Sequence, residues 1–290
     1  MTSPVIVVHG GAGGLTEEIR EHEDEIREAI ERALTAGAQA LTNAGGGAVE
    51  AVRAAVVVME SFPLFNAGHG AALCSDGSVE LSASVMRGSD RAAGGVAVLT
   101  RTRHPVAAAV ALLDEPEVLL AGANADAHAA AHGLEQCDPT EFVTERQRQR
   151  LAKNLAGEGE TVGAVCLDAA GLLAAATSTG GLQNQRPGRI GDSPLIGAGT
   201  WADRHVAVSC TGQGEAFIRA GAARLVATLV ERGEALEAAA GRALEVVTEC
   251  EGTGGLIAVD ADGNVTTPQS TEAMPRGVWR PGHKPDTRVP

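Results

Sequence analysis

Thr161 begins a short apolar segment directly after a linker rich in glycine and glutamate, Gly157–Glu160. If the backbone were cut just before Thr161, this residue would carry both a hydroxyl group and a free α-amine. An α-amine has an ordinary pKa of about 7.7–8.0, near working pH, where a general base is most effective. One residue would then supply both nucleophile and base. The alternative is that Thr161 only starts a strand, since β-branched residues favour strands.

Further hydroxyl groups occur at the end of the next apolar segment. Thr177–Thr179 ends that segment, and a turn at Asp168–Gly171 would fold it against the segment that begins at Thr161. A hydroxyl there could hydrogen-bond to the Thr161 hydroxyl and hold its rotamer. Ordinary cross-strand pairing of threonines is the alternative.

An arginine and an aspartate stand three residues apart in the glycine-rich segment Gly180–Gly199. Arg189 could bind an α-carboxylate through two parallel hydrogen bonds, and Asp192 could accept from an α-ammonium group. The two residues would therefore fit a zwitterionic amino acid. The alternative is a surface ion pair between them, worth about 0–1 kcal/mol.

Ser209–Glu215 ends a predicted strand at glycines and opens a helix. Backbone N–H groups at such a junction can form an oxyanion hole, and losing one such donor typically costs about 2.7–4 kcal/mol of transition-state stabilisation. A plain strand–loop–helix connection is the alternative. Because all three segments follow Thr161 in order, together they favour an amide hydrolase.

The elements that must position these groups are predicted from hydrophobic periodicity and from turn residues. Strands are predicted at Val5–Val8, Ala71–Ser75, Ser78–Met86, Gly94–Thr100, Thr161–Leu167, Leu172–Ser178, Val206–Cys210, Leu256–Val259 and Asn264–Thr267. Helices are predicted at Thr16–Thr42, Ala48–Ser61, Pro105–Leu113, Ala121–His132, Thr144–Leu155, Glu215–Arg232 and Ala235–Glu251.

Hairpins, rather than strict β–α–β alternation, connect these strands. This pattern favours antiparallel sheets covered by helices over a doubly wound parallel sheet. The tail from Gly277 is rich in proline and charge, and we expect it to be mobile.

Composition excludes several classes of function. The net charge of −14 and the 2% aromatic content, with no tyrosine, argue against binding to nucleic acid. No apolar stretch is long enough to span a membrane, and the N-terminal segment lacks the basic region of a signal peptide. The five cysteines lie far apart with no C-x-x-C motif, which indicates small buried residues in a reducing compartment. We therefore expect a cytoplasmic protein with no membrane or nucleic-acid partner.

Two other patterns are weak. Gly11–Thr16 lacks the third glycine of a dinucleotide-binding motif and the Lys-Ser/Thr of a Walker motif. His128 and His132 share one helix face, with Cys137 and Asp138 nearby, and this spacing could bind zinc. No glutamate completes an H-E-x-x-H motif, so we predict two solvated histidines at a helix end and no metal site.

Eight segments carry a family resemblance: Val8–Gly13, Pro63–Gly70, Thr161–Val165, Ala174–Gly181, Arg186–Arg189, Gly191–Gly199, Ser209–Gly212 and Glu251–Asp260. Through them nearly the whole chain resembles the plant-type L-asparaginase/isoaspartyl aminopeptidase family of N-terminal-nucleophile (Ntn) hydrolases.

The resemblance implies an α+β fold, a four-layer αββα sandwich of the Ntn-hydrolase type, formed by residues 1–290 as a single domain. It implies an inactive precursor that cleaves itself between Glu160 and Thr161. The products would be an α-subunit of residues 1–160 and a β-subunit of residues 161–290, and two such αβ units would form a homodimer.

The resemblance also implies roles for individual residues. Thr161 matches the nucleophile and Thr179 its supporting hydroxyl, while Arg189 and Asp192 match the substrate anchors. The further candidates are Thr211 and Gly212 on the oxyanion side, Gly212 and Gly214 in the substrate site, and Asn66 near the nucleophile. No cofactor is expected, although some relatives bind a structural sodium through backbone carbonyls around the segment matching Glu60–Asn66.

The chain departs from the family pattern at three places. Ser82 stands where the family commonly has aspartate, Leu182–Gln185 replaces a frequent Met-Thr-Asn-Lys, and Glu160 precedes the nucleophile where aspartate or glycine is frequent. These departures bear on the rate of cleavage and on substrate preference.

The sequence thus predicts an autoproteolytically activated amidohydrolase that acts on L-asparagine, on β-aspartyl dipeptides, or on both. Both substrates present the same α-carboxylate and α-ammonium groups, so the anchors do not separate them. The alternatives are a glycosylasparaginase-like hydrolase and a non-catalytic or unprocessed proenzyme.

Overall fold

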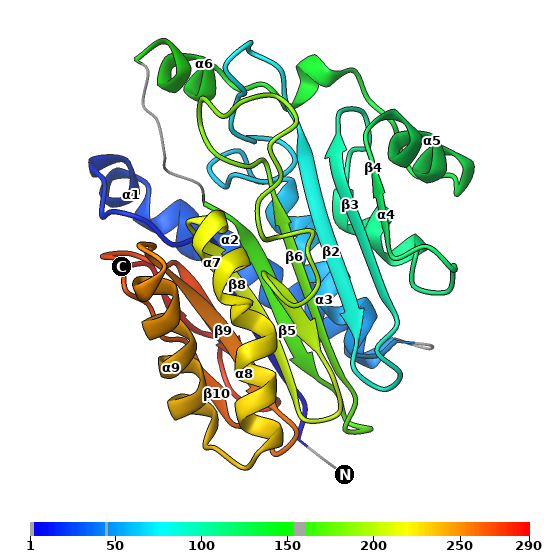
Figure 1. Ribbon diagram of the computed structural model, residues 1–290, viewed down its shortest axis with the longest axis vertical. Coiled ribbons are helices and arrows are strands. Elements are labelled where there is room, and N and C mark those ends of the chain that lie inside the picture. The colour runs from blue at the N-terminus through cyan, green and yellow to red at the C-terminus, as the bar shows by residue number, and fades with distance from the viewer. Residues whose placement is uncertain (1–2, 44–45, 154–159) are drawn as a thin grey trace.

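A computed structural model describes residues 3–43, 46–153 and 160–290, which form helices and two β-sheets (Figure 1). The predicted linker residues 157–159 lie outside the described residues. The helices are α1 (Glu17–Glu21), α2 (Glu23–Thr42), α3 (Ala48–Glu60), α4 (Pro105–Ala111), α5 (Ala123–Ala131), α6 (Glu145–Ala152), α7 (Gly214–Ala220), α8 (Ala222–Glu231) and α9 (Leu236–Glu249), with a 3-10 turn at Pro139–Phe142. The strands are β1 (Val5–His9), β2 (Leu81–Arg87), β3 (Ala93–Leu99), β4 (Leu119–Ala121), β5 (Val162–Leu167), β6 (Leu173–Thr179), β7 (Thr200–Ala202), β8 (Val206–Gly212), β9 (Gly254–Asp260), β10 (Val265–Thr266), β11 (Arg276–Trp279) and β12 (Asp286–Arg288).

The strands form a large sheet in the order β12-β11-β1-β5-β6-β2-β3-β4 and a small sheet in the order β10-β9-β8-β7. Neighbouring strands are antiparallel except β3 and β4, which are parallel. The antiparallel arrangement predicted from the hairpins is therefore confirmed, in a protein that mixes helices and sheets.

Strand β1 shows why the large sheet is buried on both faces. Side chains alternate between the faces of a strand. Ile6 and Val8 belong to the core shared with α2, α3 and α4, whereas Val5 and Val7 belong to the core shared with the small sheet. Because both faces are covered, β1 is apolar from Val5 to Val8, and every residue of the strand, His9 included, is buried.

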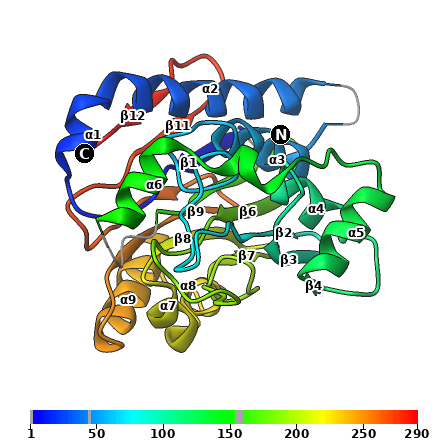
Figure 2. The ribbon, with the colours of Figure 1, turned by 90° about the horizontal axis from the view of Figure 1, so that it is seen from above.

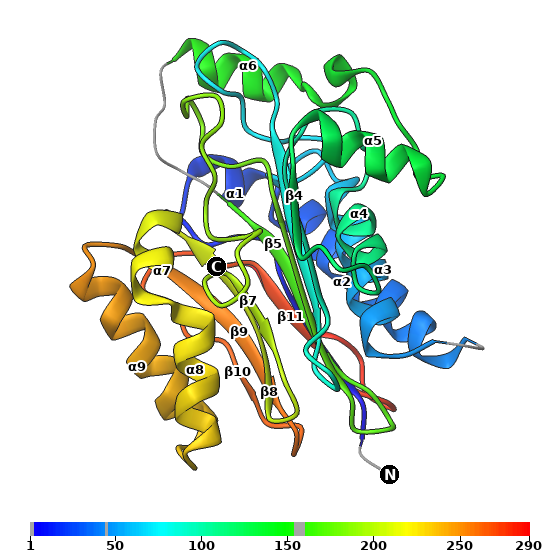
Figure 3. The same ribbon diagram turned by 45° about the vertical axis from the view of Figure 1, so that its right-hand side comes forward.

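The small sheet also has apolar residues on both faces. Val208 of β8 and Leu256 of β9 pack against α7, α8 and α9, while Ala207 and Ile257 contact the large sheet. Figures 2 and 3 show the resulting order: α2 to α4, the large sheet, the small sheet, and α7 to α9.

The hairpin of β5 and β6 sets the position of the predicted nucleophile. Its register pairs Val162 with Ser178, which places Thr161 beside Thr179. At the far end, an Asp168 carboxylate oxygen accepts from the backbone N–H groups of Ala170 and Leu172. The predicted turn at Asp168–Gly171 is therefore confirmed.

The prediction of a mobile tail from Gly277 is wrong. Strand β11 pairs with β1 and strand β12 pairs with β11, so the tail extends the large sheet to its edge. Val289 is buried in the same core as Ile30. Long-range strand pairing thus outweighs the local proline and charge content.

Other expected elements are interrupted or absent. The predicted helix Thr16–Thr42 is interrupted at His22. The predicted helix Glu215–Arg232 is interrupted at Gly221, which has a left-handed φ of 57°. Ala71–Ser75 is not a strand, although the Asp76-Gly77 turn forms, with the Gly77 N–H donating to the Cys74 carbonyl.

The cysteines behave as predicted: all five are free thiols, and all but Cys250 are buried. Among the described residues, the helices are all too short or too polar to cross a bilayer.

Candidate active site

The predicted nucleophile lies at the start of β5, where the ends of β6 and β8 also lie (Figure 1). The Thr161 side chain is buried, and its Oγ1 donates to Thr179 Oγ1 over 3.2 Å. Thr179 Oγ1 also accepts from the Gly181 N–H at 3.0 Å. Thr179 therefore fixes the direction of the Thr161 hydroxyl, as the hairpin predicted.

Asn66 stabilises the turn that follows Thr179. Its Nδ2 donates to the Gly181 carbonyl and its own carbonyl accepts from the Gly180 N–H, at 2.6 and 3.0 Å. Its Oδ1 accepts from the Ala72 N–H at 2.6 Å. Asn66 thus holds the turn that follows Thr179, the residue that hydrogen-bonds to Thr161.

The glycine-rich loop after β1 packs against the predicted cleavage site. Gly11 has a φ of 116°, and a Cβ added there would lie 2.6 Å from Glu160 Cβ. The next N–H in the loop, that of Ala12, donates to Thr211 Oγ1 at 3.1 Å. The loop therefore brings Glu160 and Thr211 to the same end of the sheets, and a small cavity of about 20 Å³ lies beside Glu160.

Gly212 ends β8 beside the loop that precedes β9. It has a φ of 139°, and a Cβ there would lie 2.4 Å from the Thr253 carbonyl oxygen. Only glycine fits this backbone conformation and this close approach. Thr211 and Gly212 pair with Gly255 and Gly254, which holds the proposed oxyanion segment in the small sheet.

The Arg189 guanidinium has a partner that the sequence did not predict. It forms a two-pronged pair with Glu215 at 2.9 and 2.8 Å, rather than an ion pair with Asp192. The Arg189 side chain is 16% exposed and that of Glu215 is 51% exposed. A substrate carboxylate would therefore compete for Arg189 with the carboxylate of Glu215, which is half exposed to solvent.

Asp192 is buried, and its Oδ2 atom has no hydrogen-bond partner among the described residues. Burial raises the pKa of Asp192 to about 7, although its own backbone N–H and the Arg189 charge oppose the rise. A cationic ligand group would restore the missing partner and favour the ionised form. Asp192 is therefore suited to receive an ammonium group.

Gly214 explains how both anchors come together. A Cβ at Gly214 would lie 2.9 Å from Arg189 Nη2 and 2.9 Å from Asp192 Oδ1. A larger residue would collide with both groups. The structure therefore brings the predicted residues Arg189, Asp192 and Gly214 into one cluster.

A chain of buried hydroxyl groups runs between the two sheets. His9 Nε2 lies 3.0 Å from Ser209 Oγ, which lies 2.7 Å from Thr177 Oγ1. Burial lowers the pKa of His9 to about 3, with a smaller opposing contribution from the Thr161 backbone. His9 is therefore neutral near pH 7 and serves as a hydrogen-bonding residue.

The same series of hydrogen-bonded hydroxyl groups extends to the loop that contains Asp192. Thr200 donates to Thr177 at 2.6 Å, and Ser84 donates to Thr200 at 2.8 Å and to the Ser193 carbonyl at 2.6 Å. These bonds tie β2, β6 and β7 to the residue after Asp192. The anchor loop thus has a fixed position relative to the strand that carries Thr179.

The departures from the family pattern lie next to this site. Ser82 of β2 stands directly opposite Thr179 in the sheet register. Gln183 Oε1 accepts from the Leu73 N–H, and Gln185 Oε1 accepts from the Leu182 N–H. The Leu182–Gln185 segment is thus held by its own amide side chains.

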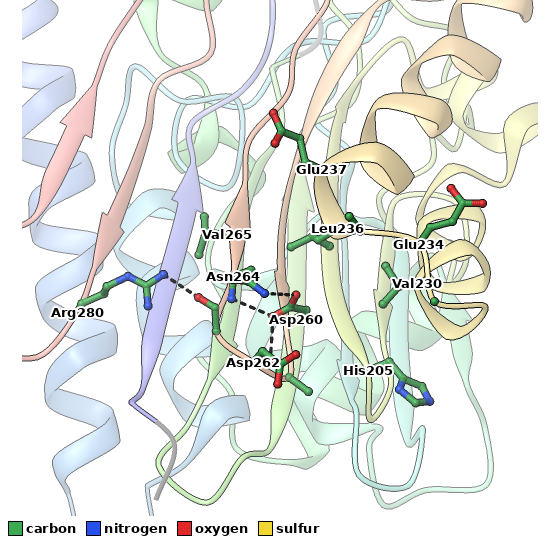
Figure 4. A pocket seen from close by; sticks show the side chains of 14 residues that line it. His205, Val230, Glu234, Leu236, Glu237, Asp260, Asp262, Asn264, Val265 and Arg280 are labelled. Carbon is green, nitrogen blue, oxygen red and sulfur yellow. Dashed lines mark hydrogen bonds between the residues drawn. The ribbon is translucent and has the colours of Figure 1, made fainter.

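A cavity of about 720 Å³ lies elsewhere, at the opposite end of β8 and β9 from Thr211 and Gly255 (Figure 4). Asp260 in this cavity accepts from Asn264 and from the Asp262 N–H, and Arg280 donates to the Gly263 carbonyl. These polar side chains stabilise the turn between β9 and β10, so a structural role accounts for them and no ligand is needed.

Sequence reasoning missed Glu215 and Gly11 as parts of the site. Glu215 follows Gly214 in the first turn of α7, but nothing in its spacing indicates that it meets Arg189. A glycine-rich loop was evident at Gly11, yet only the fold places it against Glu160. The arrangement combines the predicted hydroxyl nucleophile with backbone N–H groups and with a neighbouring cation and anion, which suits hydrolysis of an amide in a zwitterionic substrate.

Comparison with known proteins identifies the family. The sequence profile of the family described as Asparaginase matches residues 2–160 and 156–289. The isoaspartyl peptidase of Salmonella typhimurium is 42% identical over 311 residues, which cover 100% of this chain and 99% of that protein. The isoaspartyl peptidase of Escherichia coli is also 42% identical over 311 residues, covering 100% of this chain and 97% of that protein.

An animal relative gives the same result. The isoaspartyl peptidase/L-asparaginase of Bos taurus is 40% identical over 293 residues, which cover 97% of this chain and 94% of that protein. The predicted resemblance is confirmed over the full length. The chain belongs to the asparaginase family.

Proposed function

We propose that this protein is a threonine Ntn-hydrolase that cleaves itself and then hydrolyses L-asparagine, β-aspartyl dipeptides, or both. Membership of the asparaginase family supports this, as do the printed names of its relatives. The order of helices and sheets supports a four-layer αββα sandwich. We further propose a cytoplasmic homodimer of αβ units with subunits 1–160 and 161–290.

Maturation would use the Thr161 hydroxyl against the preceding peptide bond. Thr161 Oγ1 attacks the Glu160 carbonyl carbon, the C–N bond breaks, and the Thr161 nitrogen takes a proton to become an amine. Water then hydrolyses the resulting ester and leaves Glu160 with a free carboxylate. The contact of Gly11 with Glu160 supports this step because it restrains the residue under attack.

Turnover would use the amine released by that cleavage. The Thr161 amine accepts the hydroxyl proton as Oγ1 attacks the side-chain amide carbon of the substrate. Thr179 holds the hydroxyl in place, and N–H groups near Thr211 and Gly212 stabilise the oxyanion. Ammonia, or the amine of a dipeptide, leaves with a proton, and water then releases aspartate from the ester.

The cluster of Arg189, Asp192 and Gly214 is the main support for a substrate that has both an α-carboxylate and an α-ammonium group. Arg189 would bind the α-carboxylate in exchange with Glu215. Asp192 Oδ2, which has no hydrogen-bond partner within the described part of the chain, would accept from the α-ammonium. A substrate lacking the α-ammonium group would leave Asp192 buried and uncompensated, and a substrate lacking the α-carboxylate would leave Arg189 paired with Glu215 instead.

A structural sodium near Glu60–Asn66 is a further proposal. The carbonyl oxygens of Glu60 and Asn66 each accept one backbone hydrogen bond, from His69 and Gly180, so each keeps one lone pair. Such an ion would hold the loop that carries Asn66. The chemical steps need no other cofactor.

A substrate panel tests the proposal. We expect the mature protein to hydrolyse L-asparagine or a β-aspartyl dipeptide, and to lose at least 100-fold in kcat/KM when the α-amine is acetylated or the α-carboxylate is amidated. Thr161→Ala, which should be inactive, is the background control. Equal turnover of the blocked compounds would refute the anchoring roles, and preferred turnover of glycosylated asparagine would favour a glycosylasparaginase.

A further inference from the structure

Two histidines that the proposed hydrolysis does not use come together with a glutamate at the edge of the large sheet. His128 and His132 belong to the end of α5, and Glu115 lies in the loop between α4 and β4. One potential ligand atom from each of the three lies within 4.8 Å of the others. The sequence indicated the histidine pair, but only the fold adds the carboxylate.

The helix explains the histidine pair. Residues four apart lie on the same helix face, and the two rings have their centroids 4.2 Å apart and are tilted by 37° to each other. Only alanines separate them in sequence, so no bulky side chain fills the space between them. The loop after α4 then brings Glu115 Oε1 to 3.6 Å from His132 Nε2.

The hydrogen bonds leave ring nitrogens available for a ligand. His132 Nδ1 lies 3.0 Å from the His128 carbonyl, so it carries the hydrogen and Nε2 keeps its lone pair toward Glu115. Metal-binding histidines almost always use their second nitrogen in this way, which fixes the ring orientation. His128 Nδ1 is buried and has no hydrogen-bond partner among the described residues.

We propose that Glu115, His128 and His132 bind a divalent transition-metal ion of the zinc type. Two imidazoles and a carboxylate form a donor set that zinc accepts at about 2.0–2.2 Å from each atom. Tetrahedral ligands at that distance are about 3.4 Å apart, close to the separation of His132 and Glu115. The His132 and Glu115 side chains are 38% and 41% exposed, so both can shift to reach the metal ion. A water molecule would fill the fourth coordination position.

This proposed metal site lies far from the proposed active site and would have a different role. Strand β4 is four strands from β5 in the large sheet, or about 19 Å at 4.7–4.9 Å per strand. A bound ion would link the end of α5 to the loop that leads into β4. The metal would therefore stabilise this edge of the sheet rather than take part in amide hydrolysis.

Metal titration of the mature, chelator-treated protein tests the proposal. By isothermal titration calorimetry near pH 7.5, we expect about one Zn²⁺ per chain, comparable binding of Ni²⁺, and no binding of Mg²⁺, which prefers oxygen ligands. Glu115→Gln, His128→Ala and His132→Ala should each weaken Zn²⁺ binding at least tenfold, while circular dichroism stays unchanged.

Matched controls separate this site from other zinc-binding groups. Glu117→Gln and His283→Ala change the same residue types outside the cluster and should leave the affinity unchanged. Zinc should also raise the melting temperature of the unaltered protein but not that of the His132 variant. Undiminished binding in both histidine variants, or loss of binding only in Cys250→Ser, would overturn the proposal. Absence of saturable Zn²⁺ binding would overturn it as well.

Discussion

Replacing Asp192 by asparagine should stabilise the free protein at alkaline pH while destroying its substrate anchor. The carboxylate is buried, its Oδ2 has no partner among the described residues, and its pKa is raised from 3.8 to about 7. Burial is the main cause. The ionised form is therefore less stable in the folded protein than in the unfolded chain.

The magnitude follows from the raised pKa. A rise of about three units, at 1.36 kcal/mol per unit, corresponds to about 4 kcal/mol. Between pH 4 and pH 7 the folded state keeps the proton on Asp192 and the unfolded state does not, so this group lowers stability as the pH rises. The asparagine in Asp192→Asn cannot titrate. The free energy of unfolding of the variant should therefore equal that of the unaltered protein near pH 4 and exceed it by about 4 kcal/mol above pH 7.

Thermal unfolding of the two proteins from pH 4.5 to pH 8 measures this difference. For a chain of this size, 1 kcal/mol shifts the melting temperature by roughly 2–4 °C, so the variant should melt roughly 8–16 °C higher at pH 8. Added L-aspartate should stabilise the unaltered protein but not the variant, because its ammonium group pairs with the carboxylate.

A second buried aspartate provides the matched control. Asp203 accepts from Trp201 Nε1 and from the N–H groups of His205 and Val206, so Asp203→Asn should lower stability. If Asp192→Asn melts at or below the temperature of the unaltered protein at pH 8, the carboxylate has a partner and the reasoning is refuted.

Three other substitutions have defined outcomes. Thr179→Val removes a hydrogen bond worth about 1 kcal/mol, so kcat should fall roughly fivefold to tenfold in steady-state assays, and an unchanged kcat would exclude the supporting role. Arg189→Lys keeps the charge but loses the two-pronged geometry, and a loss of about 1.5–3 kcal/mol should raise KM by roughly 10- to 150-fold. Gly11→Ala places a Cβ 2.6 Å from Glu160 Cβ and should slow self-cleavage in a gel time course. Gly13→Ala, where an added Cβ meets nothing within 4 Å, is its control, and equal rates would show that Gly11 does not restrain Glu160.

The part of the site carried by one hairpin could be predicted from the sequence. Two short apolar runs joined by the turn at Asp168–Gly171 predict both strands and their pairing, which is why Thr161 and Thr179 meet as expected. The same reasoning correctly placed a helix at Glu215, since a strand that ends at glycines just before an acidic residue is a local signal for a helix start.

Contacts between distant elements could not be predicted. Arg189 pairs with Glu215 because α7 packs beside the anchor loop, and no local pattern encodes that packing. The expected strand Ala71–Ser75 fails because the side chains of Asn66 and Gln183 take the N–H groups of Ala72 and Leu73, which a strand partner would need. The tail after Gly277 likewise becomes ordered only because β1 offers it an edge.

The central claim is that cleavage before Thr161 creates the catalytic amine. Intact-mass spectrometry of freshly purified protein, with activity measured on the same sample over time, tests it most directly. We expect two polypeptides, the second beginning at Thr161, to appear in step with amide hydrolysis, and a single inactive polypeptide for Thr161→Ala. An uncleaved chain of 290 residues that hydrolyses substrate at full rate would contradict the account.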